Sequence, residues 1–417
     1  MEASVHPIRL SVQAPLVRSR LTVFFRLPLA VVHLLWLVLW SVVVVPVAVV
    51  GWLITLLSGR LPEPLHRFLT AYLRYSTHLS AFLLLVANPF PGFVGAQGSY
   101  PIDVHVAGPA RQNRWKTLFR LPLAIPATML AATLANGSFS VIGSYFSLSL
   151  SLLTAVALLG WFVALARGAL PAGYRDAGAL GLAYAAQQLA YVLLLTDRYP
   201  DSDPESLIEA ERPTDRWAEL EHLADAGRRG RLGVFFRAPL VLPHVVWLVI
   251  WGLLVYVVVL LNWFTLLVQA RSPDAFHRLI CAYLRYQLHV SAYLLLTAER
   301  YPSFIPSPQE RYVVDVRFGE PQSQSRVKTL LRLILALPAM LLAGAYANVM
   351  YTAALLGWFV ALFTGRMPRG LGALQVACLN YITQLYAYYL LVTDQYPHTG
   401  PVVPRPVSPS RPAPVGA

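Results

Sequence analysis

Residues 27–57 contain no charged side chain. About twenty apolar residues are enough to cross a hydrocarbon core roughly 30 Å thick. Similar runs follow in a chain of 417 residues that is 57% hydrophobic and only 13% charged. This composition excludes a disordered chain and argues against an ordinary soluble enzyme. We therefore expect a protein of the lipid bilayer.

The charge pattern indicates the same class. The net charge is +13, but the 33 Lys and Arg residues flank the apolar runs instead of forming one basic polar domain. That distribution is typical of membrane flanks and indicates no nucleic-acid partner. Cys281 and Cys378 are too few for a disulfide framework and lack the spacing of a thiolate zinc site.

An internal duplication organises the chain. Residues 24–28 (FFRLP) return as residues 235–239 (FFRAP), a shift of 211 residues. A finer repeat relates residues 158–165 to residues 355–362, both of which read LLGWFVAL. The predicted segments are module A (1–94), module B (95–200), a polar linker (201–233), module A′ (234–305), module B′ (306–398) and a disordered Pro-rich tail (399–417).

Each module is predicted to contain two helices joined by a Gly/Pro turn, because Gly tolerates positive φ and Pro does not continue a helix. The predicted fold class is an all-α polytopic membrane protein of four repeated two-helix modules, with about eight transmembrane helices. Residues 117–166 are apolar over a length that also permits two crossings in module B, which would add a ninth span.

Short alternating stretches precede three modules, at residues 8–12, 102–106 and 313–318. Period-two alternation predicts half-buried strands, which can pair into a small extramembrane sheet. The linker 201–233 has no such predicted strand. There we expect a short amphipathic helix that includes Trp217, Leu220 and Leu223 or Ala224.

One pair of motifs has a family resemblance. Residues 363–371 (FTGRMPRGL), followed by residues 390–397 (LLVTDQYP), resemble a bacterial membrane-protein family known only as a domain of unknown function, DUF4389. Module B′ matches best, and modules A and A′ depart further, with Glu63 or Asp274 after the turn proline. The resemblance covers nearly the whole chain in four copies. It implies a multi-pass membrane protein and transfers no activity.

Counts of basic residues predict the sidedness. The amino terminus, the linkers and the tail carry 23 Lys and Arg, whereas the turns and the early second helices carry 10. Cytoplasmic loops are enriched in these residues. We therefore expect a multi-pass plasma-membrane protein with both termini in the cytoplasm.

The second helices share a candidate inward polar face. Offsets of three residues fall on one face of a helix, where polar groups can hydrogen-bond across a contact. Aligned by their ends, the four helices hold these residues as pairs: Tyr75 and His78, Tyr184 and Gln187, Tyr286 and His289, Tyr381 and Gln384.

Modules A and A′ add a candidate cationic stripe, formed by Arg67 and Arg74 and by their copies Arg278 and Arg285. An arginine near mid-bilayer needs a carbonyl, a lipid phosphate or water beside it. One interpretation is an anion-attracting or hydrated inner surface. The other is an amphipathic helix that lies shallow, with its arginines among the headgroups. The sequence leaves both open.

No signature of hydrolase, nucleotide or zinc chemistry is present. His33 and His244 are interpreted as hydrogen-bonded core histidines, since no carboxylate or cysteine shares either segment. We therefore predict no enzyme, no catalytic residue, no metal and no cofactor.

The sequence is compatible with two functional hypotheses. The first is a non-enzymatic scaffold or accessory membrane protein, whose partners are the lipid bilayer and other membrane proteins. The alternative is a passive channel or transporter for a small solute or anion, because internal repeats are common in carriers. The sequence does not fix the oligomeric state.

Overall fold

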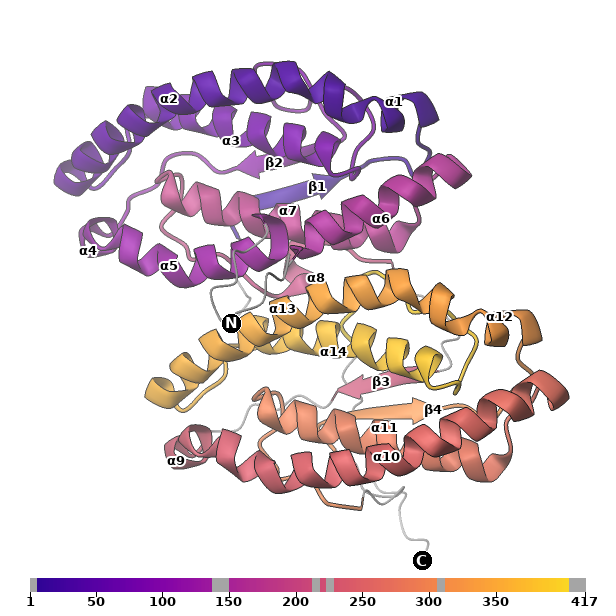
Figure 1. Cartoon of the computed structure of the whole chain (residues 1–417). Helices are drawn as coiled ribbons and strands as arrows, with labels where there is room; N and C mark the ends of the chain where they lie inside the picture. The colour runs from indigo at the N-terminus through magenta and orange to yellow at the C-terminus, as the bar shows by residue number, and fades with distance from the viewer. Residues whose placement is uncertain (1–5, 137–149, 212–217, 223–228, 306–311, 405–417) are drawn as a thin grey trace, which may run out of the picture. The chain divides into compact units, whose positions relative to one another are not determined.

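The computed structural model in Figure 1 describes residues 6–136, 150–211, 218–222, 229–305 and 312–404. The chain divides into two compact units, and the first is built chiefly from Met1–Glu211. This unit contains modules A and B, and the second contains most of A′ and B′. The described chain is mostly helical with two small antiparallel sheets, which confirms the helical and repeated part of the predicted fold.

In each module a five-residue helix leads into the long apolar helix. The short helices are α1 (Arg20–Phe24), α4 (Arg114–Leu118), α9 (Arg231–Phe235) and α12 (Arg326–Leu330). Three modules continue into an unbroken helix of 33 residues: α2 (Arg26–Ser58), α10 (Arg237–Gln269) and α13 (Arg332–Thr364). A residue with positive φ follows each of them, Gly59, Ala270 or Gly365, and stops the helix.

In module B the long helix is interrupted. It consists of α5 (Arg120–Ala131), a π-helical turn η1 (Ala132–Asn136) and α6 (Leu152–Arg167). Both α5 and α6 pack on the second helix of the module, as the single long helix α2 packs on α3 and α10 packs on α11. Module B therefore has the two parts of one long helix, separated by an insertion, where the sequence allowed an additional crossing.

The second helices have 21 residues each. They are α3 (Glu63–Leu83), α7 (Ala172–Val192), α11 (Asp274–Leu294) and α14 (Arg369–Tyr389). All four begin directly after a proline and end two residues before a leucine in the left-handed region. The four leucines are Leu85, Leu194, Leu296 and Leu391. A left-handed leucine is uncommon, and here it turns the chain sharply away from the helix axis.

The expectation of about eight spans is supported only in part. Among the described residues, α2, α10 and α13 are long and apolar enough to cross a membrane. The second helices do not qualify, because polar and charged side chains such as Arg74 and Gln187 interrupt their apolar sequence.

The strands pair within each unit. They are β1 (Ile8–Val12), β2 (Ile102–Val106), β3 (Ala218–His222) and β4 (Val314–Phe318). β1 pairs antiparallel with β2, with Leu10 opposite Val104, and β3 pairs antiparallel with β4. The predicted pairing is thereby confirmed for residues 8–12 and 102–106. The third predicted strand is also present, as β4, but its partner β3 was not among the predicted strands.

The prediction of an amphipathic helix in the linker 201–233 is wrong for the part of that helix that the structure describes. Residues 218–222 form β3, with buried Leu220 opposite Val316. The sequence AELEH alternates with period two, and the open edge of β4 supplies hydrogen-bond partners that an isolated helix would not have. Trp217, Leu223 and Ala224 lie outside the described residues, as does most of the Pro-rich tail. A one-turn helix, α8 (Pro204–Leu207), precedes β3.

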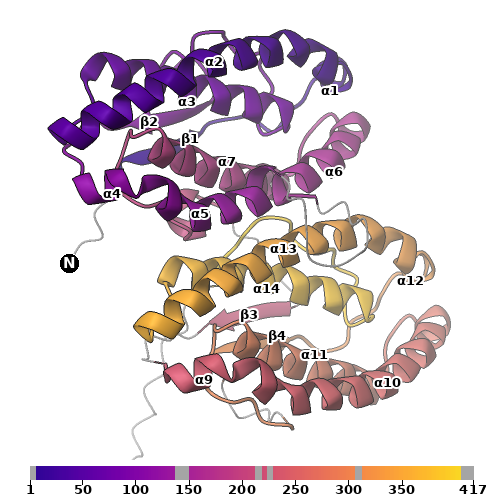
Figure 2. The same cartoon turned by 60° about the vertical axis from the view of Figure 1, so that its left-hand side comes forward.

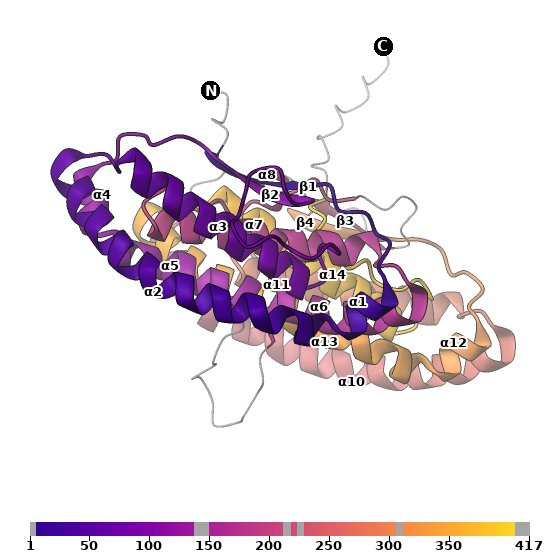
Figure 3. The same cartoon turned by 90° about the horizontal axis from the view of Figure 1, so that it is seen from above.

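Each unit is built in three layers, which Figures 2 and 3 show from two further directions. In the first unit the strands pack on α3 and α7, and the opposite sides of these helices pack on α2, α5 and α6. In the second unit β4 packs on α11, which in turn packs on α10. The sheet exposes Arg9, Ser11 and His105, whereas the long helices expose residues such as Leu35 and Val42. One side of a unit is therefore polar and the other apolar.

The two modules of a unit are interlocked. β1 lies in module A but packs on α7 of module B, whereas β2 lies in module B but packs on α3 of module A. The indole N–H of Trp52 in α2 donates to the Thr117 carbonyl in α4 over 2.7 Å, and that of Trp161 in α6 donates to the Val23 carbonyl in α1 over 3.0 Å. Trp263 and Trp358 make the equivalent bonds in the second unit.

Candidate functional site

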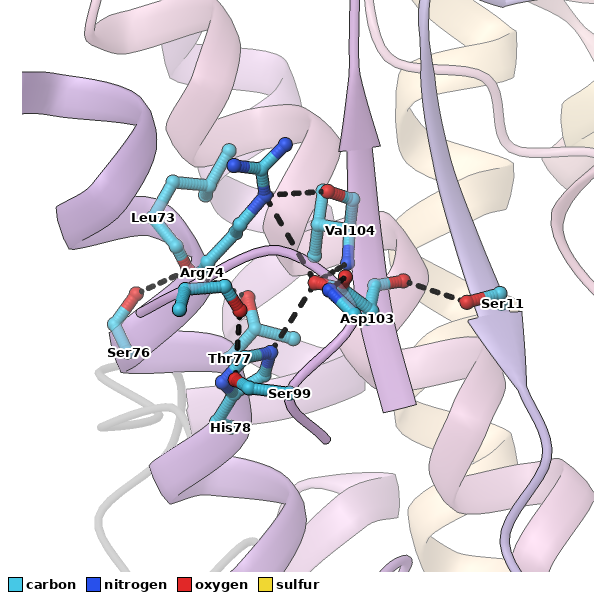
Figure 4. A network of polar contacts seen from close by, with 11 residues as sticks. Ser11, Leu73, Arg74, Ser76, Thr77, His78, Ser99, Asp103 and Val104 are labelled. Atoms are coloured by element: carbon cyan, nitrogen blue, oxygen red, sulfur yellow. Dashed lines mark hydrogen bonds and ion pairs between the residues drawn. The ribbon is translucent and has the colours of Figure 1, made fainter. Parts of the chain in front are cut away.

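In module A a second helix meets a strand through charged side chains (Figure 4). His78 Nε2 lies 3.2 Å from Asp103 Oδ1, and Arg74 Nε lies 3.8 Å from the same oxygen. Arg74 Nε also donates to the Val104 carbonyl oxygen over 3.0 Å. The three side chains are buried or nearly so, with exposed fractions of 1% for His78 and 14% for Asp103.

Backbone groups complete the surroundings of the carboxylate. Gly98 N–H donates to Asp103 Oδ2 over 2.6 Å, and Val104 N–H donates to Oδ1 over 2.8 Å. The ring of Tyr100 stacks on His78 with centroids 4.9 Å apart, and burial raises the pKa of Tyr100, so its phenol stays neutral. Both carboxylate oxygens are therefore occupied by donors from the chain itself.

The same cluster recurs in module A′ with closer contacts. Arg285 donates through Nε to Asp315 Oδ1 over 2.6 Å and through Nη2 to Oδ2 over 2.5 Å. His289 Nε2 lies 3.0 Å from Asp315 Oδ1, and Tyr312 stacks on the imidazole with centroids 4.4 Å apart. A two-pronged arginine–carboxylate pair of this kind is both stronger and more directional than a single hydrogen bond.

The electrostatics of the second cluster favour the charged carboxylate. Burial raises the pKa of Asp315, but the hydrogen bonds and charges of Arg285 and His289 outweigh burial and hold that pKa well below its usual range. Because a carboxylate only accepts, His289 Nε2 must carry the proton in this contact. Asp315 is thus an anion held by two donor side chains and by the Val316 N–H, which lies 2.9 Å from Oδ1.

The clusters join modules. Arg74 and His78 belong to module A, whereas Asp103 belongs to the strand that opens module B. Within the described residues no group of three or more His, Cys, Asp or Glu is placed to hold a metal ion. A carboxylate surrounded by the chain's own donors is suited to hold a helix against a strand, and it leaves no open position for a substrate.

In modules B and B′ glutamines occupy the equivalent position and also bind backbone. Gln187 Nε2 donates to the Ile8 carbonyl over 3.0 Å, and its Oε1 accepts from Asp201 N–H over 2.9 Å. Gln384 Oε1 accepts from His398 N–H over 2.9 Å. This position therefore ties each second helix to a strand or to the segment that follows the helix.

The tyrosines three residues earlier are buried and mostly meet the long helices. Tyr75 hydroxyl lies 2.9 Å from His33 Nδ1 and donates to the His33 carbonyl over 3.1 Å. The hydroxyl of Tyr286 lies 2.5 Å from His244 Nδ1. Tyr381 donates to the Ala339 carbonyl over 3.1 Å, and Tyr184 is buried in α7. The predicted polar face is thus divided, with tyrosines toward the long helices and His or Gln toward the strands.

The structure separates the four residues of the predicted cationic stripe. Arg74 and Arg285 are paired with the aspartates. Arg67 is exposed and lies 3.6 Å from Glu63 one turn away, and Arg278 is exposed beside a surface cleft. The exposed Arg67 and Arg278 agree with the interpretation that places arginines at a polar surface. The buried Arg74 and Arg285 agree neither with that interpretation nor with an anion-attracting inner surface, because aspartates pair with them.

Sequence reasoning missed the most regular polar feature, a buried arginine at the start of each long helix. Its guanidinium donates to freed carbonyls at the end of the second helix and lies over an aromatic ring, with Arg Cζ 4.3–4.6 Å from the ring centroid. The four pairs of arginine and ring are Arg26 with Phe82, Arg120 with Tyr191, Arg237 with Tyr293, and Arg332 with Tyr388. We call these the arginine clamps.

The clamps satisfy backbone that would otherwise be costly to bury. Arg237 Nη1 donates to the carbonyls of Tyr293 and Ala298 over 2.5 and 2.9 Å, and Arg332 Nη1 donates to the Thr393 carbonyl over 2.8 Å. The last carbonyls of a helix lack intrahelical donors and carry the negative end of its dipole, so a cation fits there. The available signal is the repeated arginine before each long apolar run, but in the sequence alone this pattern is typical of a membrane flank.

Comparison with known proteins gives one match. The family described as "Domain of unknown function (DUF4389)" matches residues 20–94, 139–202, 231–305 and 326–399, one copy for each module. No curated protein and no solved structure matches the chain. Because the four copies cover more than half of its length, the chain belongs to the DUF4389 family.

Proposed function

We propose that this protein is a non-enzymatic scaffold or accessory protein of the membrane, and that each unit sinks its long helices into lipid. The observation that carries the proposal is the exposure of those helices. Only 11% of the most apolar 18-residue stretch of α2 is buried, and 17% of that of α10. Water-soluble monomers rarely expose apolar patches beyond a few hundred Å². Lipid is the solvent that suits this surface.

The layer order supports a unit that lies flat in one leaflet. β2 contacts α3 through Arg74 and His78, which lie in the carboxyl-terminal half of that helix. If α3 stood upright in a bilayer, the sheet would enter the hydrocarbon with its open edges and the exposed side chains of Arg9 and His105. Open sheet edges do not occur in lipid, and an arginine there costs at least about 2.5 kcal/mol.

A flat orientation avoids that cost. A helix is about 10 Å across with its side chains, and half of a hydrocarbon core is about 15 Å thick. The layer of long helices fits into one leaflet, and the second helices then lie near the headgroups. The strands and their polar face remain in water.

The paired charges favour a scaffold over a channel. Arg74 and Arg285, the buried members of the stripe, are neutralised by Asp103 and Asp315. These contacts hold modules together, and they leave neither of the two buried arginines free to attract a passing anion. The rigid interlocking of modules is the property that a scaffold needs.

The second candidate arrangement has about eight crossings with cytoplasmic termini, and the Lys and Arg counts favour it. Reporter fusions distinguish the two. We expect fusions in the turns at 60, 169, 271 and 367 and in the linkers at 95 and 303 to report the same side of the membrane. Alternation between turns and linkers would contradict the flat orientation and support the multi-pass topology.

The scaffold role has its own test. Full-length protein, cross-linked in its native membrane and affinity-purified, should bring the same membrane protein in repeated preparations. The variant that tests the binding surface is Arg74→Ala, Arg285→Ala. It breaks the contacts between modules and should lose the partner if the interlocked units present the binding surface. Repeated recovery of the protein alone would contradict the scaffold role.

A further inference from the structure

A surface cleft in module A′ is lined by charges of both signs. It has a volume of about 620 Å³ and lies between the first half of α11 and the segment that follows β4. Its charged lining includes Arg271, Asp274, Arg278 and Glu320, together with the clustered Arg285. The cleft lies within one unit and is open to the surface.

Four of these charges have no partner in the described chain. Arg285 is neutralised by Asp315, but Arg271, Arg278, Asp274 and Glu320 make no ion pair or side-chain hydrogen bond with described residues. Two cations and two anions that line one cleft without pairing are complementary to a ligand that itself carries both signs.

A buried histidine adds an unpaired acceptor. His277 is only 5% exposed and lines the same cleft. Its Nε2 lies 3.0 Å from the Gly319 carbonyl oxygen, so Nε2 carries the proton and Nδ1 is left as an acceptor. Within the described residues Nδ1 has no hydrogen-bond partner. A buried polar atom without a partner is costly, and a donor on a bound ligand would satisfy it.

We propose that this cleft binds the headgroup of a zwitterionic phospholipid, a phosphodiester that bears a primary amine. Arg271 and Arg278 hold the phosphate, since guanidinium groups match phosphate oxygens in geometry and charge. Asp274, Glu320 and His277 Nδ1 accept from the ammonium group. The inference rests on the proposed flat orientation, in which α11 lies at the depth of lipid phosphates.

Module A supplies a natural contrast. Arg67 and Glu63 occupy the positions of Arg278 and Asp274, but they lie 3.6 Å apart and neutralise each other. Gly108 and Pro109 stand in the segment that corresponds to Glu320. The same helix face in module A therefore lacks the free charges and is the matched control.

The test uses the full chain in detergent and native mass spectrometry with an equimolar mixture of short-chain phosphatidylethanolamine and phosphatidylglycerol. We expect retention of phosphatidylethanolamine, and a loss of affinity of about tenfold or more in Arg271→Ala, Arg278→Ala. Asp274→Asn, Glu320→Gln should remove the preference for the amine lipid while keeping phosphatidylglycerol. The control Arg60→Ala, Arg67→Ala should bind as the unaltered protein does.

Three outcomes overturn the inference. They are equal retention in the Arg271/Arg278 variant and in the control, no preference between the lipids, and competition by free phosphoethanolamine or inorganic phosphate at the affinity of the lipid. Any of these, with the protein still resistant to extraction from membranes by carbonate, would refute the headgroup site alone. Release by carbonate would instead refute the proposed membrane embedding.

Discussion

Arg120 Nη1 donates to the carbonyl oxygen of Thr196 over 2.8 Å and so joins the start of α5 to the segment just after α7. The same guanidinium donates through Nη2 to Gln112 Oε1 over 2.6 Å and is only 1% exposed. A single residue thus closes its module into a hairpin and holds the linker before it. The equivalent arginine does the same work of closure in each of the four modules.

Removal of a clamp should destabilise its unit strongly. In Arg332→Ala the Thr393 carbonyl and Gln324 lose a charged donor that lies 2.8 and 2.7 Å away, so we expect a loss of about 3–5 kcal/mol. Circular dichroism of thermal unfolding in one fixed detergent measures it. Arg332→Lys should recover only part of the lost stability, because an ammonium group cannot reproduce the planar, two-pronged donor geometry of a guanidinium.

The matched control for the clamp is Arg326→Ala. Arg326 also donates to a helix-end carbonyl, that of Val268 over 2.8 Å, but it is exposed. Its removal should cost less than about 1 kcal/mol. Equal losses in the two variants would show that burial of the clamp adds nothing.

The sequence predicted the four modules, their helices and three strands, because periodicity and turn chemistry are local properties. β3 was missed because AELEH acquires a strand partner only when β4 lies beside it. The partner of Arg285 was also out of reach, since Asp315 lies thirty residues away on a strand.

Buried arginines, the clamps among them, affect the prediction of membrane sidedness from Lys and Arg counts. The 23 basic residues assigned to linkers include six buried ones. These six are Arg18, Arg26, Arg120, Arg229, Arg237 and Arg332. A buried arginine that serves a helix end does not report which side of a membrane it faces. Counts of Lys and Arg cannot separate the two roles without the fold.

The Asp315 cluster should make stability depend on pH. Because the folded pKa of Asp315 lies below its ordinary value of 3.8, its contribution is complete above about pH 4 and is lost as pH falls through the folded pKa. Asp315→Asn should therefore be less stable by about 3 kcal/mol at pH 7, and the gap should narrow at pH 3. Urea unfolding at both pH values measures it. A gap that stays constant would contradict the ion-pair assignment.

Gly95 should be irreplaceable for steric reasons. It has φ +60°, and a Cβ there would lie 2.1 Å from the Ala71 carbonyl oxygen and 2.8 Å from the Tyr75 nitrogen. Both atoms are helix backbone and cannot yield. Gly95→Ala should reduce the unfolding free energy by more than about 3 kcal/mol, a backbone clash added to strain.

Gly98 is the control for that substitution. Its φ is +69°, but a Cβ would meet nothing within 4 Å. Gly98→Ala should cost only the conformational strain, about 1 kcal/mol. Similar losses at the two positions would mean that strain, and not the close approach to α3, determines the choice of glycine.

The interlocking of modules predicts that the pair, and not the single module, is the folding unit. β1 needs α7 to cover its inner face, and Trp52 needs the Thr117 carbonyl of the next module. Residues 1–211 should therefore unfold cooperatively in lipid nanodiscs, whereas residues 1–94 should show no cooperative transition and rapid proteolysis. Co-expression of 1–94 with 95–211 should restore the transition, because every contact across the pair is noncovalent. Cooperative unfolding of 1–94 alone would contradict this prediction. It would mean that each module folds independently through its own clamp, and that the strand and tryptophan contacts between modules only orient modules that are already folded.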